Sequence, residues 1–199
     1  MATKNRLSNQ KSKITVRNAT PQDALEICDL STRVYKNTGM YGYSEGAITG
    51  QINHFPDGQF VITIDKKIVG YCATFRISEE IALKNHNWTE ITGNGYASRH
   101  QPDGDWLYGM EVAVDPDYRG YRLGQRLYNE RKQLCETLGL KGIVFGGRLP
   151  SLSTRIKRFG TVENYVESVI QKKQRDQVLS FQLHNGFEVI GILPEYLNS

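Results

Sequence analysis

The residues best suited to chemistry lie where a strand-like run gives way to a helical pattern. The run Val112 to Val114 is followed by a turn, and Leu123 to Leu138 then carries leucines at helical spacing. The first amides of a helix lack partners inside it, and the helix dipole adds partial positive charge beside them. Glycines let a ligand approach the backbone, and arginines supply cations. The residues concerned are Gly120, Gly124, Arg119, Arg122 and Arg126, and the pattern predicts a phosphate site.

Two familiar phosphate motifs do not occur in the sequence. It has no Gly-Lys-Ser/Thr ending of a nucleotide P-loop, and no Gly-x-Gly-x-x-Gly of a dinucleotide fold. A different class of phosphate-bearing ligand is therefore indicated.

The turn and the start of the helix carry a recognisable motif. Val114-Asp115-Pro116-Asp117-Tyr118-Arg119-Gly120-Tyr121-Arg122-Leu123-Gly124 resembles the cofactor motif of the GNAT superfamily, Arg/Gln-x-x-Gly-x-Gly/Ala after a Val-x-Pro strand end. Arg122 replaces the middle glycine, a change that we expect to be tolerated if residue 122 has φ below zero and points its side chain outward. The resemblance implies that these backbone amides hold the pyrophosphate of acetyl-CoA, while the strand pairs with the pantetheine arm. The implied cofactor residues are Val112, Ala113, Val114, Arg119, Gly120, Tyr121, Arg122, Leu123, Gly124 and Gln125.

A narrower resemblance rests on four further segments. Phe55 to Phe60, Trp88 to Thr92, Gly146 to Pro150 and Leu179 to Phe187 are similar to the GNAT domain that bacteria fuse ahead of a carbon-nitrogen hydrolase (nitrilase-like) domain. In that fusion the chain continues beyond this point, and no nitrilase Glu-Lys-Cys set is found here. A stand-alone relative and an excised domain both stay open, with a carbon-nitrogen hydrolase as partner or fused domain.

Two side chains on the predicted strand are candidates for catalysis. Acyl transfer to an amine requires a base near the thioester, and Glu111 is the first choice, with Tyr108 second. Strand alternation places Glu111 on the side of Gly109 and Ala113, with Tyr108 opposite. The alternative for Glu111 is an ion pair with a nearby arginine, and for Tyr108 it is packing.

Other candidates lie on either side of this segment. Many GNAT enzymes protonate the leaving thiolate with a tyrosine in the last helix, where this chain has Gln182. Tyr165, Arg148 and Trp88 are candidate substrate-binding residues; an ordinary exposed arginine is the alternative for Arg148. Trp88 belongs to an irregular stretch, Ser78 to Asp105, that either builds a site or is a surface loop anchored by tryptophan.

The resemblance implies an α/β GNAT fold, a central mixed, mostly antiparallel sheet with helices on both faces, over residues 14–199. Residues 1–13 are expected to form a basic, flexible arm. Periodicity predicts strands at Ile14 to Arg17, Gln59 to Asp65, Ile68 to Phe75, Leu107 to Val114, Lys141 to Phe145 and Phe187 to Leu193. Helices are predicted from Thr20 to about Tyr35, from Ser44 to Phe55, from Leu123 to Leu138, around Val162 to Ile170 and from Gln177 to His184.

Composition narrows the partners. The 199 residues carry 25 basic and 21 acidic side chains that are intermixed, which argues against nucleic acid. No run is long and apolar enough for a membrane span or a signal peptide, so we expect a soluble, cytoplasmic protein. The three cysteines and four histidines are scattered, so no metal or disulfide framework is expected.

Two functions follow from these residues. The first is transfer of an acetyl group from acetyl-CoA to a primary amine, on a small molecule or a peptide, by direct attack. The second is a non-catalytic acyl-CoA sensor or accessory domain working with a nitrilase-like amidohydrolase, suggested by Gln182 in the tyrosine place. The acceptor depends on variable loops, and the oligomeric state, including a homodimer, stays open.

Overall fold

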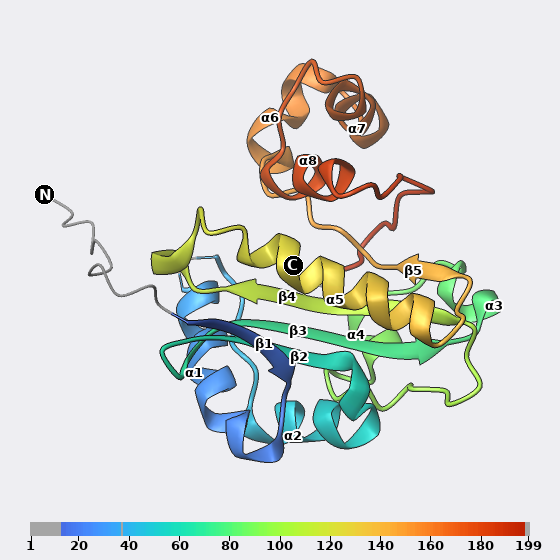
Figure 1. Ribbon diagram of the computed structural model, residues 1–199. Coiled ribbons are helices and arrows are strands. Elements are labelled where there is room, and N and C mark those ends of the chain that lie inside the picture. Colours follow the sequence, from blue (N-terminus) through green and yellow to red (C-terminus); the bar gives the residue numbers. More distant parts are fainter. Residues whose placement is uncertain (1–12, 37, 198–199) are drawn as a thin grey trace, which may run out of the picture. The chain divides into compact units, whose positions relative to one another are not determined.

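The computed structural model describes residues 13–36 and 38–197, which divide by their contacts into two compact units (Figure 1). Unit 1 contains the chain up to Lys84 together with Thr89–Val144; unit 2 contains Asn85–Trp88 and the chain from Phe145 onward. The predicted arm at residues 1–13 lies outside the described residues except for Lys13. The single domain predicted over residues 14–199 stays a prediction.

Unit 1 is built on one mixed sheet whose strands lie in chain order (Figure 1). The first three pairings are antiparallel and the last is parallel, which confirms the predicted mixed, mostly antiparallel α/β sheet. The strands are β1 (Ile14–Asn18), β2 (Gln59–Ile64), β3 (Lys67–Ile77), β4 (Trp106–Val114) and β5 (Gly142–Val144).

Helices cover both faces of this sheet. On one face Leu123 and Leu127 of α5 pack on Phe60, Ile62 and Cys72 in a buried apolar cluster. On the other face Tyr71 donates to Gln51 of α2 at 2.7 Å. The helical elements of unit 1 are η1 (Pro21–Asp23), α1 (Ala24–Tyr35), α2 (Glu45–His54), η2 (Pro56–Gly58), α3 (Glu79–Ala82), α4 (Trp88–Thr92, whose first residue belongs to unit 2), η3 (Pro116–Tyr118) and α5 (Leu123–Thr137).

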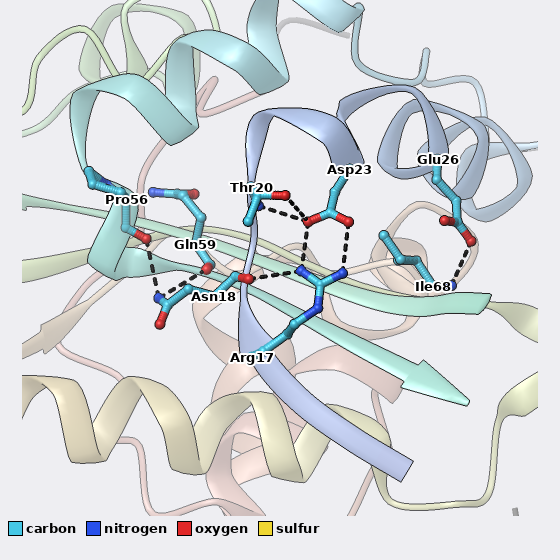
Figure 2. A network of polar contacts seen from close by, with 8 residues as sticks. All are labelled: Arg17, Asn18, Thr20, Asp23, Glu26, Pro56, Gln59 and Ile68. Atoms are coloured by element: carbon cyan, nitrogen blue, oxygen red, sulfur yellow. Dashed lines mark hydrogen bonds and ion pairs between the residues drawn. The ribbon is translucent and has the colours of Figure 1, made fainter. Parts of the chain in front are cut away.

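Polar contacts tie the end of β1 to the start of α1, as Figure 2 shows. Arg17 makes two parallel bonds to the carboxylate of Asp23, at 2.7 and 2.8 Å. The same carboxylate accepts from the backbone amide of Thr20 at 2.7 Å, which caps the first helical turn. Glu26 of α1 accepts from the amide of Ile68 at 2.7 Å, so α1 is also fixed to β3.

This network makes a prediction about pH and stability. The bidentate bond from Arg17 is the largest cause that lowers the pKa of Asp23, so the ionised carboxylate stabilises the folded state above its ordinary pKa. That contribution is lost as the pH falls through the lowered pKa. We expect Asp23→Asn to reduce the free energy of unfolding by about 1–2 kcal/mol at pH 7, a figure discounted for the exposure of Arg17. Urea unfolding at pH 7 and pH 3 should show the difference shrinking at the lower pH, and an equal difference at both would contradict this account.

The described residues of unit 2 form helices around a small apolar core. Its helices are α6 (Leu152–Phe159), α7 (Val162–Ile170) and α8 (Gln177–His184). Tyr165, Val166, Val169 and Leu179 form the buried cluster between them. Helix α8 has the predicted limits, and Gly186 follows it with φ of 81°.

One predicted element of unit 2 is wrong. Phe187–Leu193 forms no strand in the structure. Ile190 is 71% exposed and Val189 37% exposed, so these apolar residues are not buried as those of a core strand would be. A run of apolar residues makes a strand only where a neighbouring strand accepts its backbone.

The irregular stretch Ser78 to Asp105 is fastened to unit 1 by its own polar groups. Gln101 donates from its backbone to Arg76 at 2.9 Å and accepts from the amide of Ser78 at 2.6 Å. Gly95 accepts from the side chain of Gln51 at 2.7 Å. Two short helices, α3 and α4, lie in this stretch where irregular structure was predicted.

Candidate functional site

The predicted anion site is a turn that a buried carboxylate holds in place. Strand β4 ends at Val114, and Asp115, which is 1% exposed, accepts from the amide of Asp117 at 3.0 Å. The same side chain forms ion pairs with Arg33 at 3.1 Å and with Lys67 at 3.8 Å. Asp115 therefore fixes the first half of the turn to α1 and to β3.

The amides that follow are the ones available to a ligand. Arg119 donates only weakly, to Pro116 at 3.5 Å, and the first bond of α5 runs from Arg126 to Arg122 at 3.2 Å. The backbone amides from Gly120 to Gln125 lie between these two bonds. No hydrogen-bond acceptor for them is found among the residues that the structure describes. Gly120 has φ of 89°, and an added Cβ would meet no atom within 4 Å. The turn thus fits a phosphate-bearing group, as its sequence predicts.

The conformation of Arg122 does not meet one of the two conditions set for its tolerance. Its φ is 57° and its ψ 27°, in the left-handed region, whereas the condition was a φ below zero. The turn needs positive φ where the GNAT motif has glycine, so arginine costs about 1–2 kcal/mol there. Its side chain is exposed, and the strain is therefore confined to the backbone.

Strand β4 also presents an edge without a strand partner. Strand β5 pairs only with Trp106, Leu107 and Tyr108. From Gly109 to Val114, no other strand among residues 13–36 and 38–197 pairs with that side of β4. Unpaired strand groups of this kind can bond an extended ligand. Val112 to Val114, predicted to pair with the pantetheine arm, lie on this stretch.

A β-bulge in β4 changes which side chains face together. Ala73 pairs with Glu111 but Thr74 pairs with Gly109, so Met110 is an extra residue. Paired residues share a face, and a bulge interrupts alternation. Glu111 therefore lies on the face of Ala113 and Tyr108, opposite Gly109, and the prediction that Tyr108 lies opposite Glu111 is wrong.

The carboxylate of Glu111 is bound by two tyrosine hydroxyls. Tyr35, the last residue of α1, and Tyr43, just before α2, both donate to Oε2, with a distance of 3.1 Å for Tyr43. Burial raises the pKa of Glu111, and the two tyrosine bonds oppose that rise. Sequence reasoning missed both tyrosines; their one signal was the position of two phenols on either side of the break between two predicted helices.

The ion-pair alternative for Glu111 is not what the structure shows. Arg131 of α5 is 2% exposed and donates to the backbone carbonyls of Ala73, at 2.9 Å, and of Glu111. No arginine in the described ranges forms an ion pair with the Glu111 carboxylate itself. Arg131 thus satisfies carbonyls beside the bulge, where the ladder is interrupted.

Tyr108 has the surroundings of a packing residue. Its side chain is fully buried, and its ring lies 5.1 Å from that of Phe75. A catalytic part for Tyr108 stays a prediction.

The predicted substrate-binding residues and Gln182 lie in unit 2. Tyr165 is fully buried and donates to Asp176 at 2.9 Å, which gives it a place in the core. Arg148 is partly exposed in an irregular segment, and Trp88 opens α4 and donates its amide to Tyr196 at 2.8 Å. Gln182 of α8 is 9% exposed, and a Cβ on Gly147 would lie 2.5 Å from its amide oxygen. Substrate contact by Trp88, Arg148 and Tyr165 stays a prediction.

The described residues were also compared with the requirements of metal, thiolate and membrane sites. Within residues 13–36 and 38–197, no group of three or more His, Cys, Asp or Glu side chains could hold a metal ion. Burial raises the pKa of the Cys28, Cys72 and Cys135 thiols, which disfavours a thiolate nucleophile. No helix in the same residues is long and apolar enough to cross a membrane.

Comparison with known proteins identifies related sequences. A family model described as the acetyltransferase (GNAT) family matches residues 24–152. A Bacillus subtilis protein described as probable hydrolase YhcX is 38% identical over 99% of this chain, which spans only 38% of that protein. Another B. subtilis protein, the uncharacterized N-acetyltransferase YkwB, is 29% identical over 92% of this chain and 82% of its own length.

The solved structures include a GNAT-like decarboxylase, GphF, in complex with isobutyryl-CoA. It superimposes with a TM-score of 0.78 at 24% identity, over 92% of this chain and 90% of that one. This likeness extends over both units and supports the fold. With the family model spanning most of the sheet, the turn and α5, the chain belongs to the acetyltransferase (GNAT) family.

Proposed function

We propose that this chain transfers an acetyl group from acetyl-CoA to a primary amine, on a small molecule or a peptide, by direct attack, with Glu111 as the base. The observation that carries the proposal is the run of amides from Gly120 to Gln125 that lacks acceptors in the described residues, at the end of the strand that bears Glu111. Acetyl-CoA would supply the acetyl group as an activated thioester.

The chain's own groups have defined parts in this reaction. The amides from Gly120 to Gln125 would hold the pyrophosphate, with cationic side chains nearby. The unpaired edge of β4 from Val112 to Val114 would bond the pantetheine arm. Each part uses backbone groups that lack partners within residues 13–36 and 38–197.

Proton transfer decides the role of Glu111. A primary amine is protonated at neutral pH and must lose a proton before it attacks. Burial raises the pKa of Glu111, which makes it a stronger base than an ordinary glutamate. The leaving group is a thiolate whose conjugate thiol has a pKa of about 8.5, so it needs only modest assistance from a proton donor.

Gln182 favours a second candidate, a non-catalytic acyl-CoA sensor or accessory domain. An amide cannot protonate a thiolate, and Gln182 is largely buried against Gly147. The similarity to part of a probable hydrolase is consistent with a carbon-nitrogen hydrolase as partner or fused domain.

Calorimetry and a CoA-release assay separate the two. Acetyl-CoA binding together with CoA release in a panel of primary amines would support the transferase. Binding without release in any amine would favour the sensor, and no binding at all would remove both.

The turn can be tested with a matched pair of glycine variants. We expect Gly120→Ala to weaken acetyl-CoA binding about 10- to 100-fold, because a methyl group on this backbone disturbs amides that bond a charged ligand. Gly139→Ala is the control: Gly139 has φ of 62°, and its Cβ position is equally open, but it follows the other end of α5. Both variants carry similar backbone strain, so an equal loss of affinity by calorimetry would rule out a local effect at the turn.

A further inference from the structure

The carboxylate of Glu111 has more hydrogen-bond donors than a general base requires. Two hydroxyl groups from different elements, Tyr35 and Tyr43, donate to the same carboxylate oxygen, Oε2. Phenol donors bond an ionised carboxylate more strongly than a protonated one.

The segment that delivers Tyr43 is held firmly against α1. The backbone amide of Tyr43 donates to Ser31 Oγ at 2.9 Å, and Ser31 in turn donates to the carbonyl of Cys28 at 2.8 Å. A Cβ on Gly42 would lie 2.8 Å from the hydroxyl oxygens of Ser31 and Thr32, so a glycine is needed for this approach. The position of the Tyr43 hydroxyl is therefore built into the fold.

We propose that Tyr35 and Tyr43 are positioning residues for Glu111, which orient its carboxylate and keep it ionised in the working enzyme. This inference rests on the proposed role of Glu111 as the base. It extends the site to the end of α1 and to the segment before α2.

Other ionisable groups also influence this carboxylate electrostatically. Tyr71 of β3 lies on the same face of the sheet, whereas Cys72 of β3 and Arg131 of α5 act from the opposite face. Burial is the largest influence and raises the pKa of Glu111; the bonds from Tyr35 and Tyr43 come next and lower it, followed by the charge of Arg131. Burial beside Glu111 raises the pKa of Tyr43 well above its ordinary value, so Tyr43 stays protonated and acts as a donor.

The test uses Tyr35→Phe, Tyr43→Phe and the double variant, because phenylalanine keeps the ring and removes only the hydroxyl. The Glu111 carboxyl is followed by carbon-13 NMR in protein labelled with δ-¹³C glutamate, and Glu111→Gln assigns its signal. We expect the midpoint of its titration to move to higher pH in each single variant and further in the double variant. Tyr41→Phe is the matched control, since Tyr41 lies in the same segment with its side chain 94% exposed.

The acid limb of kcat/KM gives a second readout. At pH values on the acid side of this limb, loss of one tyrosine hydroxyl should lower kcat/KM about tenfold. At high pH, where Glu111 is ionised in every protein, kcat/KM of the variants should equal that of the wild type. A purely structural defect would lower the rate at every pH. Thermal unfolding of each variant shows whether it is folded.

The NMR titration distinguishes the role of Glu111 as the base from the role of Tyr35 and Tyr43 as positioning residues. If Glu111→Gln retains full turnover while the tyrosine variants still shift the Glu111 titration, the base role fails and the positioning role stands. If the Glu111 titration is unchanged in the double variant, Tyr35 and Tyr43 do not act on this carboxylate and the inference is overturned.

Discussion

Glu111→Gln is expected to lower kcat/KM for the amine about 100- to 10,000-fold, the range that a positioned general base contributes. Glutamine keeps the size of the side chain and an oxygen that can accept from Tyr35 or Tyr43, but it cannot take up a proton. The affinity for acetyl-CoA should not change, because the amides from Gly120 to Gln125 do not involve this side chain. A CoA-release assay gives the rate, and calorimetry gives the affinity.

The pH dependence and a surface variant serve as controls. Because burial raises the pKa of Glu111, the acid limb of kcat/KM in the wild type should lie above the ordinary range of a glutamic acid, and it should disappear in Glu111→Gln. Glu136→Gln, on the exposed face of α5, should leave rate and profile unchanged. Equal rates for Glu111→Gln and the wild type would show that the proton leaves by another route.

Arg131→Met is expected to reduce the free energy of unfolding by about 2–5 kcal/mol, because two buried carbonyls lose a charged donor at about 1–3 kcal/mol each. These carbonyls belong to Ala73 and Glu111, on either side of the interrupted ladder. Methionine fills much of the volume, so the loss reports mainly on the hydrogen bonds. Part of it is offset, because the guanidinium Nε has no hydrogen-bond partner in the described residues and its burial is itself unfavourable.

Urea unfolding at pH 7 measures this loss. Gln133→Met is the matched control, since Gln133 lies on the same helix but is exposed, and it should stay within about 0.5 kcal/mol of the wild type. If Arg131→Met is as stable as that control, the bulge does not depend on Arg131.

Local pattern was sufficient to predict the parts of the site made from backbone. The strand that ends near Val114, the turn and the helix from Leu123 follow each other within one short stretch, and each has its own signal in apolar spacing, proline or glycine. Helix α8 was predicted equally well, because apolar spacing and Asn185-Gly186 define its end. The predicted anion site needs only these local elements.

The rest depends on contacts between distant residues. The bulge at Met110 arises from the register with β3 and has no mark in the sequence of β4, so strict alternation placed Tyr108 and Gly109 on the wrong faces. Phe187–Leu193 has strand-like apolar residues but forms no strand in the structure, because periodicity alone cannot supply the partner that a strand needs. Tyr35 and Tyr43 reach Glu111 only through tertiary packing of α1 and the segment before α2.

The extra residue in β4 also has a consequence for the helix that covers the opposite face of the sheet. Deleting Met110 would restore simple alternation and leave Glu111 opposite Ala73, on the side of both phenols, because paired residues share a face. It would also close the interruption in the ladder, where Arg131 now donates to the carbonyls of Ala73 and Glu111. A buried guanidinium without those acceptors is unfavourable, so we expect related chains that lack the extra residue to lack this arginine of α5 as well.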